Sequence, residues 1–270
     1  MPGMALTPVV LSPALPSELL SYIVTQHSYP TTLVVCCPRA DFLSGLADDV
    51  QGRIATETSN DTDGPGPYES APESPGQAIT ATTRLLAAPL YQVAVARHIR
   101  MVFIPTVSHL RAFLSVFSPE DSKIAPPPVP HPSKADSSVS AKRPPFLVIY
   151  GFLGLHRDTS EWSAQGLSNT AAGLIETAKR LTFRAVILEP RHHEAEPEPD
   201  AELDQLLPVL SGSARRYGPD MEELGWIGRT VELRRVLGRW FRFEDGEWDD
   251  NDKLRKDHTA RRELDIGGNS

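Results

Sequence analysis

Four short and nearly continuous apolar runs constrain the fold of this chain most strongly. They predict strands at 31–37, 101–104, 146–150 and 184–190. A strand that is apolar on both sides has to be covered on both sides, which is typical of parallel sheets flanked by helices. Helical patterns follow or precede these runs along the chain. The sequence therefore predicts an α/β fold with a mainly parallel sheet that is covered on both faces.

The helices are indicated by apolar residues that recur on one side at a spacing of three and four. Ser17 is placed as an N-cap of the first helix, and the spacing of Asp158 and Glu161 is that of a capping box before the longest one. Gly151 and Gly154 indicate a tight loop after the third strand. The patterns predict helices at 17–26, at 40–50, at 80–98 with a break near Pro89, from Pro105 to Phe117, and at about 161–181.

Prolines concentrate in three polar stretches. The chain has 25 prolines in 270 residues, and the stretches at about 52–80, 118–145 and 191–206 hold many of them with few apolar residues to bury. We expect these stretches to be disordered insertions in a single domain that spans 15–243. The polar segment 244–270 predicts a disordered acidic tail.

Charge and cysteine content exclude several classes of protein. A formal net charge of −8 argues against a protein that coats nucleic acid with its whole surface, although a local basic patch remains compatible with it. Cys36 and Cys37 are the only cysteines, too few for a disulfide framework or a four-cysteine zinc site. No apolar run reaches the roughly 18 residues of a transmembrane helix, and residues 1–30 lack the pattern of a signal peptide. We expect a soluble intracellular protein with no membrane partner.

A basic segment lies near the end of the predicted domain. Residues 211–243 contain seven arginines and four acidic residues, with Tyr217, Trp226, Trp240 and Phe241 between them. Arginines bind phosphates and aromatic rings stack on bases, so the segment indicates nucleic-acid binding; the alternative is a solvated face paired with nearby acidic stretches. Short β-prone runs meeting at 237–238 predict an antiparallel terminal hairpin. The candidate nucleic-acid-binding residues are Arg215, Arg216, Arg229, Arg234, Arg235, Arg239 and Arg242.

The order of these elements resembles the ATPase core of RecA-like recombinases and their paralogues, over roughly 15–243 apart from the insertions. "RMVFIPTVSHLRAFLSVF" is similar to the strand and Leu-rich helix of that family, and "PFLVIYGFLGLHRDTSEWSAQGLSNTAAGLIETAKRL" to its Walker B strand and the long helix after it. "RAVILEP" resembles the next strand, and "GRTVELRRVLGRWFRF" the closing hairpin. The resemblance implies a RecA-like three-layer α/β/α domain.

The ATPase motifs of that family are missing from this sequence. A phosphate-binding loop needs glycines, a lysine and a Ser or Thr, and none of the six lysines of this chain follows a glycine. The strand 146–150 runs into Gly151 where a Walker B strand would end in an acid, and Asp158 is better explained as a helix cap. We therefore expect a pseudo-ATPase with no catalytic, cofactor-binding or metal-binding residues.

The resemblance implies a function in homologous recombination. We expect a non-catalytic subunit of a DNA repair complex, similar to subunits of the fungal Shu complex, that helps a recombinase filament to assemble on single-stranded DNA. Its partners would be other RecA-like paralogue subunits or a recombinase in a hetero-oligomer, and single-stranded DNA. Its location would be the nucleus, with the cytoplasm as the alternative.

Two other functions remain open. An Elongator-type subunit would also have a RecA-like fold without a phosphate loop, and would bind tRNA. An α/β-hydrolase is suggested by "LVIYGFLGL", but Ser168, Ser211 and Ser213 lack the flanking glycines of a nucleophile elbow. His156, His192 and His193 could serve such an enzyme as a base. A metal site at His192, His193 and Glu194 is disfavoured because adjacent side chains on a strand diverge.

Overall fold

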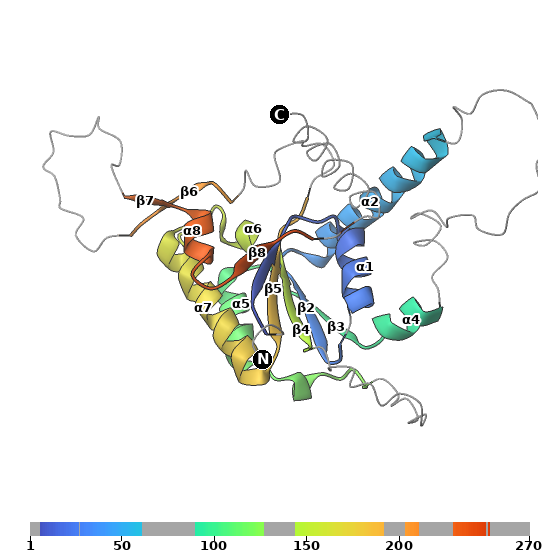
Figure 1. Cartoon of the computed structure of the whole chain (residues 1–270), viewed down its shortest axis with the longest axis horizontal. Helices are drawn as coiled ribbons and strands as arrows, with labels where there is room; N and C mark the ends of the chain where they lie inside the picture. Colours follow the sequence, from blue (N-terminus) through green and yellow to red (C-terminus); the bar gives the residue numbers. More distant parts are fainter. Residues whose placement is uncertain are drawn as a thin grey trace, which may run out of the picture.

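A six-stranded sheet forms the centre of the computed structural model (Figure 1). The structure describes residues 6–26, 28–60, 90–126, 144–191, 203–210, 229–246 and 248, without the side chains of 56–60 and 91. The strand order is β3-β2-β4-β5-β1-β8, and every pair of neighbours is parallel. The strands are β1 (Val9–Leu11), β2 (Thr31–Val35), β3 (Ile99–Phe103), β4 (Phe146–Tyr150), β5 (Arg184–Leu188) and β8 (Arg242–Glu244).

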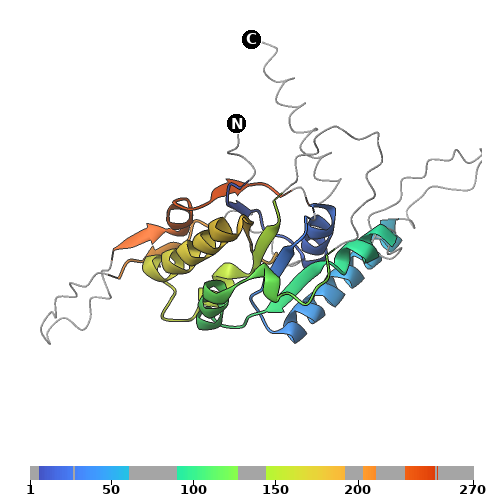
Figure 2. The same cartoon turned by 90° about the horizontal axis from the view of Figure 1, so that it is seen from below.

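Helices cover both faces of this sheet, as the two views show (Figures 1 and 2). α1 (Pro16–Gln26) and α2 (Arg39–Asn60) lie on one face, with α4 (Leu90–Ala96) beside α1. α5 (Val107–Val116), α7 (Ala164–Leu181) and α8 (Leu233–Leu237) lie on the other. The predicted α/β class with a mainly parallel sheet is confirmed.

Side chains alternate between the two faces along each central strand. In β4, Leu147 and Ile149 join the core under α5 and α7, whereas Phe146, Val148 and Tyr150 join the core under α1 and α2. All five are buried, which is why the run is apolar at every position. The period of two along a strand thus sends one continuous apolar run into two separate cores.

The connections between strands change their direction across the sheet and the face that they cover at the same point, β3. The chain passes from β1 to β2 and on to β3 in one direction across the sheet, with α1 and α2 on one face. From β3 through β4 and β5 to β8 it passes in the opposite direction, with α5, α7 and α8 on the other face. Because the direction and the face change together, every crossover connection has the same handedness, as the twist of parallel strands requires.

The first strand was not predicted. β1 is three residues long and lies between Pro8 and Pro13, too short to show a pattern, yet all three residues are buried between β5 and β8. The predicted domain start at residue 15 therefore omits a strand from inside the sheet. The strands predicted at 31–37, 101–104, 146–150 and 184–190 agree with β2, β3, β4 and β5 to within a few residues.

The terminal hairpin predicted around 237–238 is wrong. Leu233, Val236 and Leu237 are buried at helical spacing, and the segment forms α8 instead. β7 (Thr230–Glu232) pairs antiparallel with β6 (Leu206–Pro208), while β8 adds to β1 in parallel. A single turn of helix has too few residues to distinguish its pattern from that of a strand.

Two predicted helix caps and one loop are also corrected. α7 starts at Ala164 with Ser163 as its N-cap, which accepts a hydrogen bond from Gly166 N, so Asp158 and Glu161 form no capping box there. Asp158 instead has a left-handed backbone with φ of 60°. Ser17 lies inside α1, which begins one residue earlier. The tight loop predicted at Gly151 to Gly154 is α6 (Phe152–His156), a short helix.

The predicted insertions lie mostly outside the described residues, at 61–89, 127–143 and 192–202. Residues 52–60, predicted to be disordered, belong to α2, and 119–121 form the short helix η1 (Pro119–Asp121). Of the predicted tail, Glu244 belongs to β8 and Trp248 packs edge-on against Tyr22 at 5.5 Å. No helix in the described ranges is long and apolar enough to cross a membrane.

Candidate functional site

The carboxyl ends of the strands contain two positions where neighbouring strands lead to opposite faces. β2 leads to α2 on one face, while the adjacent β4 leads to α6 and α7 on the other. β1 leads to α1, while the adjacent β5 leads to β6 on the opposite face. Ligands of α/β sheets bind at such switch points, so this edge is the candidate functional site.

At the position between β1 and β5, the start of α1 is occupied by carboxylates of the chain itself. Glu18 is 1% exposed, and its Oε2 accepts a hydrogen bond of 2.8 Å from Leu15 N at the helix start. Asp49 of α2 accepts one of 2.9 Å from Ser17 N. Backbone N–H groups at a helix start bind anions, and here internal carboxylates take that role.

Two arginines complete this ion-pair network. Arg53 of α2 donates to Glu18 at 2.8 Å and to Asp49 at 3.2 Å, and Arg191 donates to Glu18 at 2.5 Å. Burial raises the pKa of Asp49, but the hydrogen bonds from Ser17 and the charge of Arg53 outweigh it, so the pKa lies below its ordinary value. The network joins α1, α2 and the end of β5.

At the position between β2 and β4, β4 is followed by Gly151, which has a left-handed backbone with φ of 83°. The nearest acid comes from β5: Glu189, 5% exposed, accepts a 2.9 Å hydrogen bond from Leu153 N at the start of α6. Tyr150 donates its hydroxyl to Ala14 O at 3.1 Å, and burial together with the Glu189 charge raises the pKa of that hydroxyl. The structure ends β4 at Tyr150, as the sequence predicted, and the acid nearest to this end comes from the neighbouring strand.

Backbone hydrogen bonds also join the ends of β1 and β5. Ala14 N donates to Glu189 O and Arg191 N donates to Ala14 O, both at 3.0 Å. The carboxyl edge is thus tied together by backbone bonds and by buried charges. The described part of the chain has two lysines. Lys123 follows η1 and Lys179 lies in the last turn of α7, so neither lies in the loop before α1. This arrangement suits a structural link better than the binding of a phosphate.

The residues of this network were missed by sequence analysis. A proline at the first helical position with an acid two residues later is a helix-start signal, and Pro16 and Glu18 form one. No comparable local signal marks Arg53, which lies 35 residues from Glu18, or Arg191, which lies 173 residues away.

The structure places five of the seven predicted nucleic-acid-binding arginines. Arg215 and Arg216 lie outside the described residues. Arg229 is exposed before β7. Arg234 is half-buried on α8, where it stacks on Phe243 at 5.0 Å and lies 3.5 Å from Asp204.

The remaining three arginines are exposed but do not share one face. Arg235 lies on α8 and Arg239 in the turn after it, four residues further along the chain. Arg242 lies on β8 opposite Val9, whose side chain belongs to the core under α1 and α2, while α8 lies on the other face. The structure therefore places Arg235 and Arg239 on α8 and in the turn that follows it, and places Arg242 on the opposite face of the sheet from α8.

A buried histidine lies next to the start of α7. His156 is fully buried; its Nδ1 lies 2.8 Å from Phe152 O, which can only accept, so Nδ1 carries the proton. Nε2 lies 2.9 Å from Thr170 Oγ1, whose single hydroxyl proton is shared between Nε2 and Gly166 O at 3.2 Å. Thr170 Oγ1 accepts in turn from Arg111 Nε at 2.9 Å. Burial is the main reason why the pKa of His156 lies below its ordinary value.

This histidine should make the protein less stable in acid. Below about pH 6.5 the unfolded chain binds a proton at residue 156 that the folded chain does not, so stability falls as the pH falls, by up to about 1.4 kcal/mol per pH unit. We expect His156→Gln, although less stable at neutral pH, to lose less stability between neutral pH and mildly acidic pH than the unaltered protein. Urea unfolding at both pH values measures this, and equal losses would contradict it.

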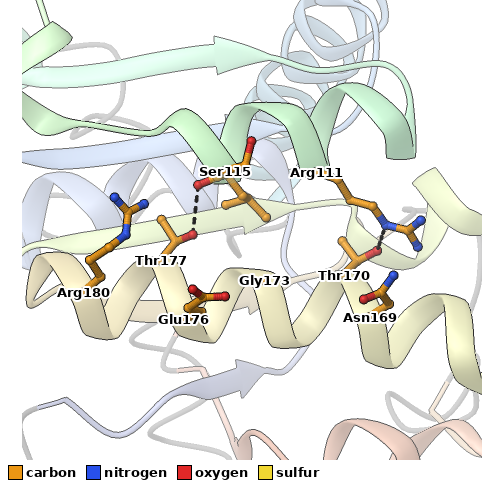
Figure 3. Close-up of a pocket in the computed structure, with 9 residues that line it drawn as sticks. Arg111, Ser115, Asn169, Thr170, Gly173, Glu176, Thr177 and Arg180 are labelled. Atoms are coloured by element: carbon orange, nitrogen blue, oxygen red, sulfur yellow. Dashed lines mark hydrogen bonds between the residues drawn. The ribbon is translucent and has the colours of Figure 1, made fainter.

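A groove of about 310 Å³ lies between α5 and α7 (Figure 3). Arg111 lies at one end and Arg180 at the other. Arg111 is held by Glu161 at 2.5 Å and by Gly166 O at 3.0 Å, and its hydrogen bond lowers the pKa of Glu161. Arg111 is therefore bound by its own chain.

The other candidate chemistries find little support in the described residues. Cys36 is buried and Cys37 half-buried, and burial raises the pKa of both thiols, which lowers their reactivity. Ser168 lies within α7, not on a strand-to-helix turn. Within the described ranges no group of three His, Cys, Asp or Glu side chains could hold a metal, and the suggested His192, His193 and Glu194 fall outside those ranges.

Comparison with known proteins identified no relative of this chain. No protein-family model, no curated protein and no solved structure matches this chain.

Proposed function

We propose that this chain is a non-catalytic RecA-like subunit of a DNA repair complex, acting in homologous recombination to help a recombinase filament assemble on single-stranded DNA. The observation that carries the proposal is the occupation of both switch points by the carboxylates of the chain itself. An α/β sheet of this kind would bind a nucleotide there if it were a motor. Here the same positions hold Glu18, Asp49 and Glu189, all buried.

The electrostatics of that edge argue against nucleotide hydrolysis. A triphosphate needs free N–H groups and cations, but Leu15 N, Ser17 N and Leu153 N already donate to carboxylates. An incoming phosphate would have to displace a buried negative charge that two arginines hold in place. A sheet that binds no nucleotide can still serve as a scaffold, so these features fit a subunit that acts by binding partners.

Two features support the choice of partners. Three of the four segments that resemble the recombinase core lie in the structure as β3 and α5, as β4 to α7, and as β5, and their strands belong to one sheet. The fourth segment forms β7, α8 and β8 in place of the closing hairpin. A surface of this architecture suits contact with a RecA-like paralogue or a recombinase. Arg235 and Arg239 make no ion pair with any described residue, so both are available to DNA phosphates.

Binding to single-stranded DNA tests the proposal directly. We expect salt-sensitive binding, and we expect the double variant Arg235→Ala with Arg239→Ala to bind more weakly. Its slope of log K against log salt should be smaller by about 0.7 for each phosphate contact that is lost. Fluorescence anisotropy of a labelled oligonucleotide over a salt series measures both effects.

The matched control removes the same charge elsewhere. Arg39 and Arg97 are also exposed, so Arg39→Ala with Arg97→Ala should leave the affinity nearly unchanged. An equal loss in both double variants would mean that total charge, not this surface, governs binding. A strong preference for tRNA over single-stranded DNA would favour the Elongator alternative, and tight magnesium-dependent ATP binding in calorimetry would overturn the proposal.

A further inference from the structure

One large aromatic side chain is exposed in the arginine-bearing segment. Trp240 is 38% exposed, more than any other Phe, Tyr or Trp side chain that the structure describes. Its neighbour Phe241 is buried at 4%. Exposing the apolar surface of a tryptophan to water is unfavourable. Packing in the core therefore does not explain why part of this ring lies at the surface.

The turn that carries Trp240 is held firmly in place. Leu237 O accepts hydrogen bonds from Trp240 N at 2.9 Å and from Phe241 N at 3.0 Å, and Gly238 N donates to Arg234 O at 2.8 Å. Leu237 and Phe241 anchor the turn in the core beneath α8. Trp240 is thus presented on a rigid support, which reduces the entropy lost when a ligand binds to it.

The charges around the ring favour a polyanion. Arg239 is the preceding residue and Arg235 lies four residues before Arg239, both exposed and neither in an ion pair with a described residue. Arg234, by contrast, is committed to Asp204 and Phe243. An exposed aromatic ring on the same helix and turn as two exposed arginines has the chemistry that binds a base and its flanking phosphates.

We propose that Trp240 is a stacking site for one unpaired base of single-stranded nucleic acid, with Arg235 and Arg239 on the phosphates beside it. This inference rests on the proposed function, because it names the group through which the same surface selects single strands. In a duplex the bases already stack on one another, so a protein ring gains little there. Stacking on a protein ring contributes about 1–3 kcal/mol per base, which corresponds to about a 5- to 150-fold change in affinity.

The test compares a single-stranded oligothymidylate with an abasic oligonucleotide of equal length and with a duplex. We expect Trp240→Ala to weaken oligothymidylate binding by about 5- to 150-fold while leaving abasic and duplex binding unchanged. Trp240→Phe should recover most of the affinity, because it keeps an aromatic face. Trp240→Leu keeps an apolar side chain without the stacking surface, so it should bind as weakly as the alanine variant and serves as the probe if that variant does not fold.

The outcomes separate the two proposals. If the double arginine variant weakens binding and the tryptophan variants bind as the unaltered protein does, the stacking site is wrong and the proposed function stands. An equal loss on the abasic oligonucleotide would also overturn the stacking site, since no base is present there. If the unaltered protein binds none of the probes even at low salt, the DNA contact itself is wrong and the stacking site falls with it.

Discussion

Replacing Glu18 by alanine should lower the free energy of unfolding by about 2–4 kcal/mol. The substitution removes one of the two carboxylates that pair with Arg53, whose side chain is only 17% exposed, and leaves Asp49 at 3.2 Å. It also removes the hydrogen-bond acceptor of Leu15 N at the start of α1. We place the effect below the about 3–5 kcal/mol of a fully buried pair because Arg191 is 42% exposed and keeps contact with water. Urea unfolding at neutral pH measures it.

Two variants make this result specific. Glu18→Gln preserves the size of the side chain and an acceptor for Leu15 N, so it should cost less than alanine. Glu120→Ala removes an exposed carboxylate from η1 and should change the stability by no more than about 0.5 kcal/mol. If Glu18→Ala behaves like Glu120→Ala, the network does not stabilise the carboxyl edge, and the observation that carries the proposed function is lost.

The second large effect is expected at Phe152, the residue after Gly151 at the end of β4. Its side chain is fully buried and its ring lies 4.7 Å from that of His156. Phe152→Ala should lower the free energy of unfolding by about 3–5 kcal/mol, because the lost apolar contacts leave a cavity that the sheet cannot close. Thermal unfolding and urea unfolding both report this loss.

The control for this substitution is a large-to-small change at the surface. Val116 of α5 is 74% exposed, so Val116→Ala should stay within about 0.5 kcal/mol of the unaltered protein. A small effect of Phe152→Ala would mean that α6 is held loosely and that the end of β4 is open. The expected large effect would mean that the start of α6, directly after β4, serves packing.

The apolar runs were sufficient to predict most of the sheet. β2, β4 and β5 are covered on both faces, so almost every residue in them is buried. Buried positions are mostly apolar, so each strand is a continuous apolar run that can be recognised in the sequence. α7 was recognised for the same reason, since its buried residues recur on one side. β1 was missed because it has three residues, and α8 was assigned to a hairpin because it has five. Neither element is long enough to establish a period.

The sequence by itself determined the α/β class, the parallel sheet and the absence of an acid at the end of β4, because each of these depends on residues that are close together in the chain. Only the tertiary structure decided which carboxylates occupy the switch points and which arginines share a surface. Glu18 is joined to Arg191 across 173 residues, and Arg242 is separated from Arg235 by the two faces of one sheet. Hydrophobic patterning acts locally, whereas ion pairs of this kind form only after the strand order has brought distant segments together.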